Sequence, residues 1–215
     1  MRRTLENALC PPRHDYRGLR RLRNRGPSPE RVMRVIAGNF KGRKLLCPRG
    51  LRVRPTADPI KETMFNLIGD FVQGSTALDV FAGVGTLGIE ALSRGAHEVY
   101  FVEQNRTALR YLARNLEEVG VGDEAVVLRG DAFRWMKRLH AQGRRYDLVF
   151  CDPPYGEGLV DRVLSLEHVA ALVQHGGALV IEHHVKEEIS RSFARYRLKT
   201  HRRSGDTCVS VLTVL

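Results

Sequence analysis

Three glycines in the first half of the chain have the spacing of a nucleotide-binding turn. Gly83, Gly85 and Gly88 form a G-x-G-x-x-G pattern directly after the apolar run 76–81. Such a pattern lets a strand turn sharply into a helix, lets the backbone approach a ligand closely and lets the helix pack on the strand. Taken alone, it fits a nucleotide cofactor and an ordinary strand-to-helix turn equally well.

A carboxylate beside this turn narrows the choice of cofactor. Asp79 stands four residues before Gly83, near the carboxyl end of the predicted strand. NAD and FAD place a pyrophosphate on the following helix N-terminus, where a nearby carboxylate would repel it. S-adenosylmethionine (SAM) carries an ammonium and a sulfonium group, which a carboxylate attracts. We therefore favour a SAM-dependent methyltransferase, with NAD or FAD binding as the competing hypothesis.

Acidic residues follow the next two predicted strands as well. Glu103 ends the first of them, 18 residues after Gly85, where its carboxylate can accept hydrogen bonds from both ribose hydroxyls. Asp131 follows the second strand and can accept from the adenine 6-amino group, cap the helix that begins there, or do both, with Phe133 beside the ring. The predicted cofactor-binding residues are Asp79, Phe81, Gly83, Gly85, Glu103, Asp131 and Ala132.

Asp-Pro-Pro-Tyr at residues 152–155 is the most specific motif in the chain. Two prolines after a buried strand fix the backbone and leave carbonyl groups without competing N–H donors. Asp152 and the Pro153 carbonyl can then accept both hydrogens of an exocyclic amine, so that its lone pair faces a methyl donor. Tyr155 can stack on a flat base. We predict Asp152, Pro153, Pro154 and Tyr155 as the catalytic residues.

The thiols and imidazoles show no metal-ligand spacing. Cys151 could serve as a nucleophile, but it lies inside an apolar strand, where burial raises the pKa of a thiol, so we interpret it as a core residue. His183 and His184 are adjacent on a predicted strand, and adjacent strand residues point to opposite faces. We therefore predict no metal site.

Cysteine usage and hydropathy indicate a cytoplasmic protein. No two cysteines form a C-x-x-C pair, and scattered thiols fit a reducing compartment. No apolar run approaches the roughly 20 residues that a membrane-spanning helix needs. The Arg-rich N-terminus lacks the apolar core of a secretion signal. The four cysteines are Cys10, Cys47, Cys151 and Cys208.

Strand-like and helix-like segments alternate from residue 58 onward, which predicts a parallel sheet with helices on both faces. Arg203-Ser204-Gly205-Asp206 joins the last two strands as an antiparallel hairpin. The expected fold is α/β, a Rossmann-like seven-stranded class I methyltransferase sheet with this C-terminal antiparallel hairpin, preceded by a small N-terminal β-hairpin. The predicted strands are residues 76–81, 98–103, 125–129, 147–151, 178–182, 193–201 and 207–214, and the predicted helices are residues 58–69, 86–94, 106–119, 132–142, 160–174 and 185–191.

Positive charge is concentrated in the N-terminal quarter of the 215-residue chain. The formal net charge is +11; residues 1–55 contain 16 Lys or Arg against 3 acids, and the remainder contains 19 against 21. A basic segment on a near-neutral body predicts a nucleic acid as partner. We expect a basic, disordered extension at 1–32, an RNA-binding β-hairpin at 33–57 with its first strand at Val35-Ile36, and a SAM-dependent methyltransferase domain at 58–215. The predicted substrate-binding residues are Arg34, Arg43, Lys44, Arg52 and Arg54.

The motifs together resemble a known family. Asp-x-Phe-Ala-Gly-x-Gly at residues 79–85, with the later Asp-Pro-Pro-Tyr, resembles the exocyclic-amine methyltransferases of nucleic acids. Arg-Val-Ile-Ala-Gly-Asn-Phe-Lys-Gly-Arg at 34–43, Arg-Pro-Thr at 54–56 and Glu-Thr-Met-Phe-Asn at 62–66 resemble the RsmD family, the bacterial 16S rRNA guanine-N2 methyltransferases. The resemblance runs from about Met33 to the C-terminus; Pro59 and Lys61 stand where the family usually has arginines.

This resemblance implies methylation of the 2-amino group of a guanine in 16S rRNA, within an assembling 30S particle and with SAM as cofactor. It also implies that Asp79, Gly83, Gly85, Glu103 and Asp131 bind SAM and that residues 152–155 hold the base.

Two other functions remain open. A DNA adenine-N6 methyltransferase shares Asp-Pro-Pro-Tyr, although this sequence shows no extra domain for duplex recognition. A non-catalytic RNA-binding assembly factor would not need the full set of strand-end acids. Comparing methyl transfer to hemimethylated DNA with transfer to 30S particles distinguishes the DNA methyltransferase from the RsmD-type function. A SAM-binding titration distinguishes the non-catalytic assembly factor from a methyltransferase.

Overall fold

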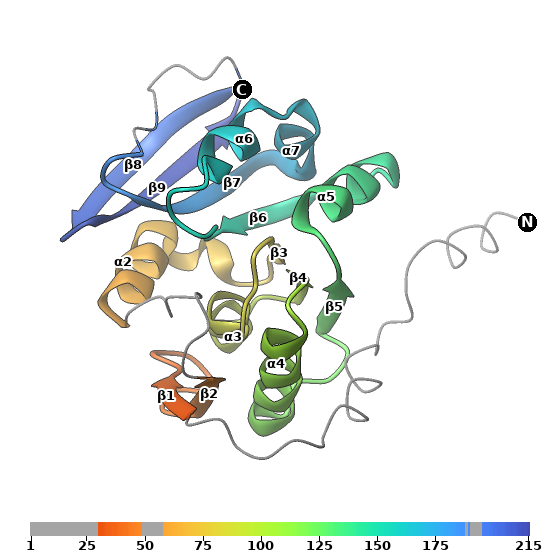
Figure 1. The fold of residues 1–215 in the computed structure, drawn as a ribbon, viewed down its shortest axis with the longest axis vertical. Helices are drawn as coiled ribbons and strands as arrows, with labels where there is room; N and C mark the ends of the chain where they lie inside the picture. Colours follow the sequence, from red (N-terminus) through yellow and green to blue (C-terminus); the bar gives the residue numbers. More distant parts are fainter. Residues whose placement is uncertain (1–29, 49–57, 188, 190–194) are drawn as a thin grey trace, which may run out of the picture.

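The computed structural model describes residues 30–48, 58–187, 189 and 195–215 (Figure 1). A seven-stranded sheet forms its centre, in the order β5-β4-β3-β6-β7-β9-β8. The strands from β5 to β7 pair in parallel, and β9 pairs antiparallel with both β7 and β8. This order confirms the predicted class of fold. The strands are β3 (Thr76–Asp79), β4 (Glu98–Glu103), β5 (Ala125–Arg129), β6 (Tyr146–Cys151), β7 (Val173–His184), β8 (Tyr196–Ser204) and β9 (Thr207–Val214).

Helices cover both faces of the sheet, as the alternating pattern predicts. One core cluster joins α2, α3 and α4 to the sheet, and a second joins α5, α6 and α7 to its other face. The apolar residues Leu109, Leu112 and Leu116 recur at helical spacing and turn one side of α4 into the first cluster. None of the described helices combines the length and apolar character needed to cross a membrane. The helices are α2 (Asp58–Ile68), η3 (Gly69–Val72, a 3-10 turn), α3 (Thr86–Ser93), α4 (Arg106–Val119), α5 (Ala132–Ala141), α6 (Leu159–Ser165) and α7 (Glu167–Leu172).

A two-stranded antiparallel hairpin, β1 (Glu30–Arg34) and β2 (Lys44–Pro48), lies beside α3 and α4 (Figure 1). The prediction of a strand at Val35-Ile36 was wrong, because these residues already belong to the connecting loop. There the backbone N–H of Ile36 binds a side chain of α3 instead of a neighbouring strand. Residues 1–29, most of the predicted disordered extension, and residues 49–57 lie outside the described residues.

The region after β6 differs most from the prediction. The helix predicted at 160–174 is two helices, because Leu166 between them is extended, with φ −85° and ψ 118°, and β7 already begins at Val173. β7 also continues past its predicted end to His184. The start of the helix predicted at 185–191 is instead a turn at Val185 and Lys186, and most of the rest of that prediction lies outside the described residues. β8 is described from Tyr196, and residues 193 and 194 of its predicted span lie outside the described part.

The three described cysteines are buried thiols: Cys47, Cys151 and Cys208. Burial holds the pKa of the Cys151 thiol well above its usual value, which suits a core residue and not a nucleophile. Cys10 lies outside the described residues.

Candidate active site

The carboxyl ends of β3, β4, β5 and β6 meet at one edge of the sheet, on either side of the point where the strand order reverses. Hydrogen bonds join the segments at this edge: Val80 N donates to Phe150 O over 3.0 Å, and Gly130 N donates to Glu103 O over 2.9 Å. Open α/β sheets bind their ligands at such a switch point. The strand ends and loops gathered there carry the predicted site residues Asp79, Glu103, Asp131 and Asp152.

The glycine turn after β3 has the geometry that its spacing predicts. β3 ends at Asp79, two residues earlier than expected, because the chain already turns there. Gly83 and Gly85 have φ values of 56° and 90°, in the left-handed region that favours glycine. At Gly88 a Cβ would lie only 2.2 Å from the Phe101 ring on β4, so this glycine lets α3 pack directly on the sheet.

Asp79 is almost completely buried, with 1% of its surface exposed. Its Oδ2 accepts a hydrogen bond from Gly88 N over 3.1 Å, whereas its Oδ1 is buried and has no partner in the part of the chain that the structure describes. Burial raises the pKa of this carboxyl to about 7, and the hydrogen bond from Gly88 opposes the rise. A buried acceptor oxygen without a partner is costly unless a ligand or water satisfies it. The Oδ2 of Asp79 therefore holds the start of α3 through Gly88, and its Oδ1 suits a cationic ligand.

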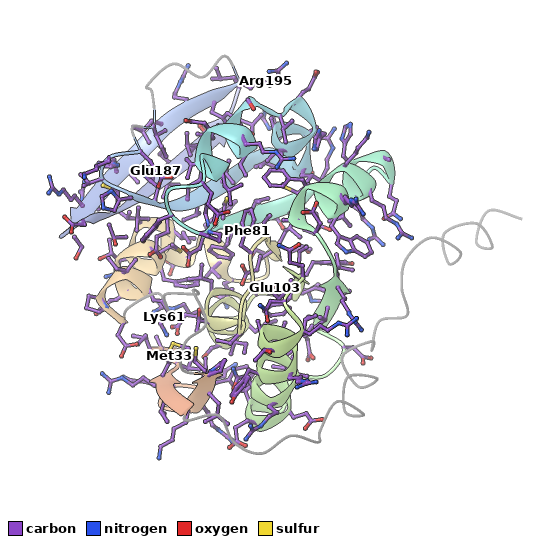
Figure 2. All side chains as sticks on the ribbon, in the orientation of Figure 1. Met33, Lys61, Phe81, Glu103, Glu187 and Arg195 are labelled. Carbon is purple, nitrogen blue, oxygen red and sulfur yellow. The ribbon has the colours of Figure 1, made fainter. Side chains whose placement is uncertain are left out.

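Glu103 anchors the glycine turn from the end of the neighbouring strand. Its Oε2 accepts from Gly83 N over 2.8 Å, and its Oε1 accepts from Asn105 N over 2.6 Å. Burial raises the pKa of this carboxyl, while the backbone hydrogen bonds favour its ionised form. Because an ionised carboxylate has about four acceptor positions, it can still accept from hydroxyl groups of a ligand. Figure 2 labels Glu103 and Phe81 on adjoining segments in the middle of the molecule.

Asp131 caps α5, one of the two roles that its position predicts. Its Oδ1 accepts from Arg134 N over 2.9 Å. The bond fixes the side chain at the start of the helix, directly before the buried Ala132. The cap does not prevent the carboxylate from also accepting from an amino group.

Two aromatic rings lie next to these carboxylates. Phe81, in the turn after β3, meets Phe133 of α5 edge to face, with ring centroids 6.1 Å apart. The Arg162 guanidinium of α6 lies 3.7 Å over the Phe133 ring. One face of Phe133 is thus occupied by Arg162, a contact that no spacing in the sequence indicates.

The Asp-Pro-Pro-Tyr motif follows β6, next to β3 in the sheet. Asp152 is half-buried, Pro153 is buried and Pro154 is exposed. The motif therefore lies at the edge of the core, where one part is fixed by packing and another part faces solvent. This is the placement expected of residues that hold a substrate.

The C-terminal strands fix the Tyr155 ring. Its hydroxyl donates to Glu182 Oε1 of β7 over 2.8 Å and lies 3.3 Å from Thr207 Oγ1 of β9. Its ring meets the His184 imidazole edge to face, with centroids 5.9 Å apart. Burial and the nearby Glu182 carboxylate raise the pKa of the tyrosine, so its hydroxyl stays protonated and donates. These partners, which sequence reasoning missed, hold the ring in one orientation.

A buried carboxylate fastens the N-terminal hairpin to α3. Glu90 is fully buried, and its two oxygens accept from Ile36 N over 2.8 Å and Ala37 N over 3.0 Å. One turn further along the helix, Ser93 Oγ accepts from Phe40 N over 2.9 Å. Glu90 is the one charged residue in α3, and a charge inside an apolar helix is the sequence signal that could have found this contact.

Lys61 of α2 joins the same buried group. Its Nζ donates to the backbone carbonyl of Arg34 over 2.7 Å and lies 3.9 Å from Glu90 Oε2. Figure 2 shows Lys61 between α2 and the hairpin. Burial lowers the pKa of this amine, and the Glu90 carboxylate opposes that shift. Lys61 therefore helps to attach the hairpin to α2 and α3.

The amide of Asn115, on α4, pairs with the backbone of β2. Its Oδ1 accepts from Leu46 N over 2.8 Å, and its Nδ2 donates to Leu46 O over 3.0 Å. The side chain is completely buried. This contact supplies part of the hydrogen bonding that a third strand would give to β2.

The predicted substrate-binding cations are only partly described. Arg34 is exposed and pairs with Asp58, with Nε 3.0 Å from Oδ2. Arg43 Nη1 donates to the Glu118 carbonyl of α4 over 3.2 Å, and Lys44 is exposed at the start of β2. The other two predicted residues, Arg52 and Arg54, lie outside the described residues.

The two adjacent histidines point to opposite faces of β7, as predicted. His183 lies on the face away from the candidate site, where its ligand atom, that of His201 and that of Cys208 are within 4.8 Å of one another. The hydroxyl of Ser210 lies 3.0 Å from His183 Nε2 and 2.9 Å from His201 Nδ1, so one nitrogen of each imidazole already has a hydrogen-bond partner. We regard the group as a hydrogen-bonded cluster and keep the prediction of no metal site.

Known proteins resemble most of this chain. Residues 33–213 match the family described as Conserved hypothetical protein 95. Ribosomal RNA small subunit methyltransferase D of Escherichia coli (strain K12) is 32% identical over 173 residues, 80% of this chain and 85% of the relative. The chain belongs to the RsmD family. YlbH of Bacillus subtilis (strain 168), a putative rRNA methyltransferase, is 40% identical over 160 residues, 73% of this chain and 85% of the relative.

Solved structures agree with this assignment. The putative methyltransferase yhhF from Escherichia coli matches with a TM-score of 0.72 and 30% identity, over 86% of this chain and 98% of that chain. The protein is therefore a methyltransferase of the RsmD family, and the resemblance found in the motifs is confirmed.

Proposed function

We propose that this protein transfers the methyl group of SAM to the exocyclic 2-amino group of a guanine in the 16S rRNA of the small ribosomal subunit. Membership of the RsmD family supports the reaction and the class of RNA. One structural observation carries the proposal. β3 and β6 are paired neighbours with Asp79 opposite Phe150, so the glycine turn and the Asp-Pro-Pro-Tyr motif leave the sheet side by side.

The residues around the glycine turn fit SAM. When bound, SAM supplies an electrophilic methyl group on a sulfonium sulfur. The buried Asp79 Oδ1 has no hydrogen-bond partner among the described residues and suits a cationic ligand. Glu103 retains acceptor capacity for ribose hydroxyls, and Asp131 retains it for the adenine amino group. Phe81, Gly83, Gly85 and Ala132 complete the proposed cofactor-binding residues.

Asp152 and the Pro153 carbonyl orient the guanine amine. Each accepts one of the two amine hydrogens, which turns the nitrogen lone pair toward the methyl donor. Asp152 then stabilises the positive charge that develops on the nitrogen and accepts the proton that the nitrogen loses. The half-buried position of Asp152 supports this function, because a carboxylate shielded from water acts more strongly on a nearby charge.

Tyr155 provides a platform for the guanine ring. Sequence-specific RNA recognition commonly stacks an unstacked base on an aromatic side chain. The hydrogen bond to Glu182 and the contact with His184 hold the Tyr155 ring before any base arrives. Less conformational freedom is then lost when the base binds.

The N-terminal hairpin is the proposed contact for the RNA backbone within the 30S particle. Arg34, Arg43 and Lys44 present positive charge on a hairpin that buried bonds attach to α3 and α4. Cations on a rigid support lose less conformational entropy on binding phosphate than cations on a mobile tail. The same role is proposed for Arg52 and Arg54.

Mapping the methyl group tests this function. Purified protein is incubated with labelled SAM and 30S particles from a strain that lacks the protein, and the modified nucleotide is located in the rRNA. We expect label on a guanine N2, and a loss of about 10²–10⁴ in turnover for Asp152→Ala with SAM affinity nearly unchanged. Label on adenine N6 of DNA instead, or SAM binding without any transfer, would reject the proposal.

A further inference from the structure

We propose that the β8–β9 hairpin forms a second RNA-contacting surface, in which Arg202 binds the phosphate backbone of the strand that carries the target base. The inference rests on the proposed function, because it takes Tyr155 as the platform for that base. It concerns a part of the chain far from the basic N-terminal quarter.

The near-neutral body of the chain has an uneven charge distribution. Residues 195–206 contain five Lys or Arg and a single acid, Asp206. The basic residues on β8 are exposed, and β8 is the edge strand of the sheet. Arg195, just before the strand, pairs with Glu167 of α7, with Nη2 3.4 Å from Oε2. The cations on β8 are Arg197, Lys199, Arg202 and Arg203.

Strand register places Arg202 on the same face of the sheet as Tyr155. Arg202 lies opposite Val209 of β9, and Val209 lies opposite Glu182 of β7. Glu182 accepts the hydrogen bond from the Tyr155 hydroxyl. Directly opposed residues on antiparallel strands point to the same face, about 4.5–5.5 Å apart for each pair of strands. Arg202 therefore begins roughly 10 Å from Glu182, on the face that the Tyr155 ring occupies.

The next residue, Arg203, belongs to the other face. It lies opposite Cys208, and Cys208 lies opposite His183, in the cluster on the far side of the sheet. Its Nε donates to the Gly205 carbonyl over 2.8 Å and closes the β8–β9 turn. Arg202 and Arg203 are thus neighbours on one exposed strand, but only Arg202 lies on the face where a ligand at Tyr155 would bind.

The chemistry of this surface fits a phosphodiester backbone. A guanidinium keeps its charge at every physiological pH and binds phosphate oxygens through paired N–H groups. One terminal nitrogen of Arg202 donates to the His201 carbonyl over 2.9 Å, which orients a group that has five N–H donors. A base stacked on Tyr155 brings its flanking phosphates with it, and Arg202 lies on the adjoining part of the same face.

Basic residues on an edge strand can serve another purpose, which is to prevent pairing with a second sheet. That purpose depends on charge along the edge and not on the face from which it projects. If the charges only protect the edge, losing Arg202 and losing Arg203 should have equal effects. If Arg202 contacts RNA at Tyr155, only the loss of Arg202 should weaken RNA binding. This difference makes the adjacent pair a matched comparison.

The test compares Arg202→Gln with Arg203→Gln, which remove the same charge from neighbouring exposed positions. Binding to 30S particles from a strain that lacks the protein is measured by filter retention over a series of salt concentrations. We expect Arg202→Gln to weaken binding about three- to tenfold and to reduce the slope of log affinity against log salt by about one, the signature of one lost phosphate contact. Arg203→Gln should change neither quantity. SAM affinity should be the same for both variants and the unaltered protein, and denaturant unfolding checks that both variants remain folded.

Equal losses in the two variants, or no loss in Arg202→Gln, would overturn the inference. Arg202→Lys should retain the salt slope, because it keeps the charge while losing the paired geometry. Methyl transfer by the unaltered protein is measured on the same particles. If the unaltered protein transfers the methyl group and Arg202→Gln binds the particles normally, this surface is rejected and the proposed function stands. If only Arg202→Gln loses binding but the unaltered protein transfers no methyl group, the proposed function is rejected and the surface stands.

Discussion

Asn115 Nδ2 donates a hydrogen bond to the Val84 carbonyl, in the middle of the glycine turn, over 2.9 Å. The same amide pairs with Leu46 of β2, so one buried side chain joins the proposed cofactor turn to the proposed RNA-binding hairpin. A buried amide of this kind loses its water partners on folding and depends on its protein partners. The two binding elements are therefore held in one fixed relationship.

Asn115→Asp tests this link, because the change keeps the shape of the side chain but removes both Nδ2 hydrogen bonds. We expect a loss of about 3–5 kcal/mol in the free energy of unfolding, because the buried Leu46 and Val84 carbonyls lose their donor and face an uncompensated carboxylate charge. Affinity for SAM and for 30S particles should fall together. Calorimetry with SAM and denaturant unfolding measure these effects. Asn66→Asp, the same change at an exposed position of α2, is the control; lower stability with unaltered SAM affinity would contradict the link.

Two glycines of the hairpin loop provide a second test. Gly38 and Gly42 have φ values of 80° and 82°, so alanine at either position bears a similar backbone strain of about 1–2 kcal/mol. A Cβ at Gly38 would lie 1.8 Å from the Ser93 carbonyl of α3, whereas a Cβ at Gly42 meets nothing within 4 Å. Gly38→Ala should therefore cost about 1–3 kcal/mol more than Gly42→Ala in denaturant unfolding, the usual penalty for overpacking.

Activity of these two variants extends the test to function. Gly38→Ala should lower methyl transfer to 30S particles far more than Gly42→Ala, because it pushes the loop off α3. If the two alanine variants proved equally stable and equally active, the loop would not depend on its contact with Ser93.

The raised pKa of Asp79 predicts that the stability of the fold depends on pH. Its folded pKa of about 7 is above the usual value of 3.8, so this group stabilises the fold fully at low pH and loses that effect as pH rises between those two values. Asp79→Asn should therefore be more stable than the unaltered protein at pH 8, by an amount on the order of a few kcal/mol, and the gap should close toward pH 4.

The comparison uses denaturant unfolding of both proteins at several pH values in the absence of SAM. The side-chain carbonyl of the Asp79→Asn variant would still accept from Gly88 N, which makes the charge the main difference. The same variant should bind SAM more weakly, because the charge that costs stability is the one proposed to attract the ligand. A stability difference that stayed constant with pH would show that Asp79 does not titrate in this range.

Much of the sheet edge that carries the candidate site could be predicted from local sequence, because strands that end in acidic residues recur along the chain. β4 and α4 have the predicted bounds, and the acids at strand ends lie at one edge since parallel strands share their direction. The partners of the hairpin could not be predicted in this way. Ile36 and Glu90 are 54 positions apart, and Leu46 and Asn115 are 69 positions apart. No spacing rule connects a loop N–H to a side chain at such separations.

The boundary between α7 and β7 shows a different limit. Leu172 and Val173 are both buried and apolar, and Val173 pairs with Tyr146 of β6. An apolar run of this kind suits a buried helix and a buried strand equally well, so periodicity does not divide it. Pairing with β6, a tertiary contact, decides that the strand begins there.

Glu103→Ala provides the last prediction, since Glu103 both anchors the glycine turn and is proposed to bind the ribose. The variant loses the hydrogen bonds from Gly83 N and Asn105 N and any bond to ligand hydroxyls. We expect SAM binding to weaken by about 1–3 kcal/mol, measured by calorimetry, because charge-assisted hydrogen bonds are lost. Glu98→Ala, at the opposite end of β4, is the matched control and should bind SAM normally. Equal SAM affinity in both variants would remove Glu103 from the cofactor site.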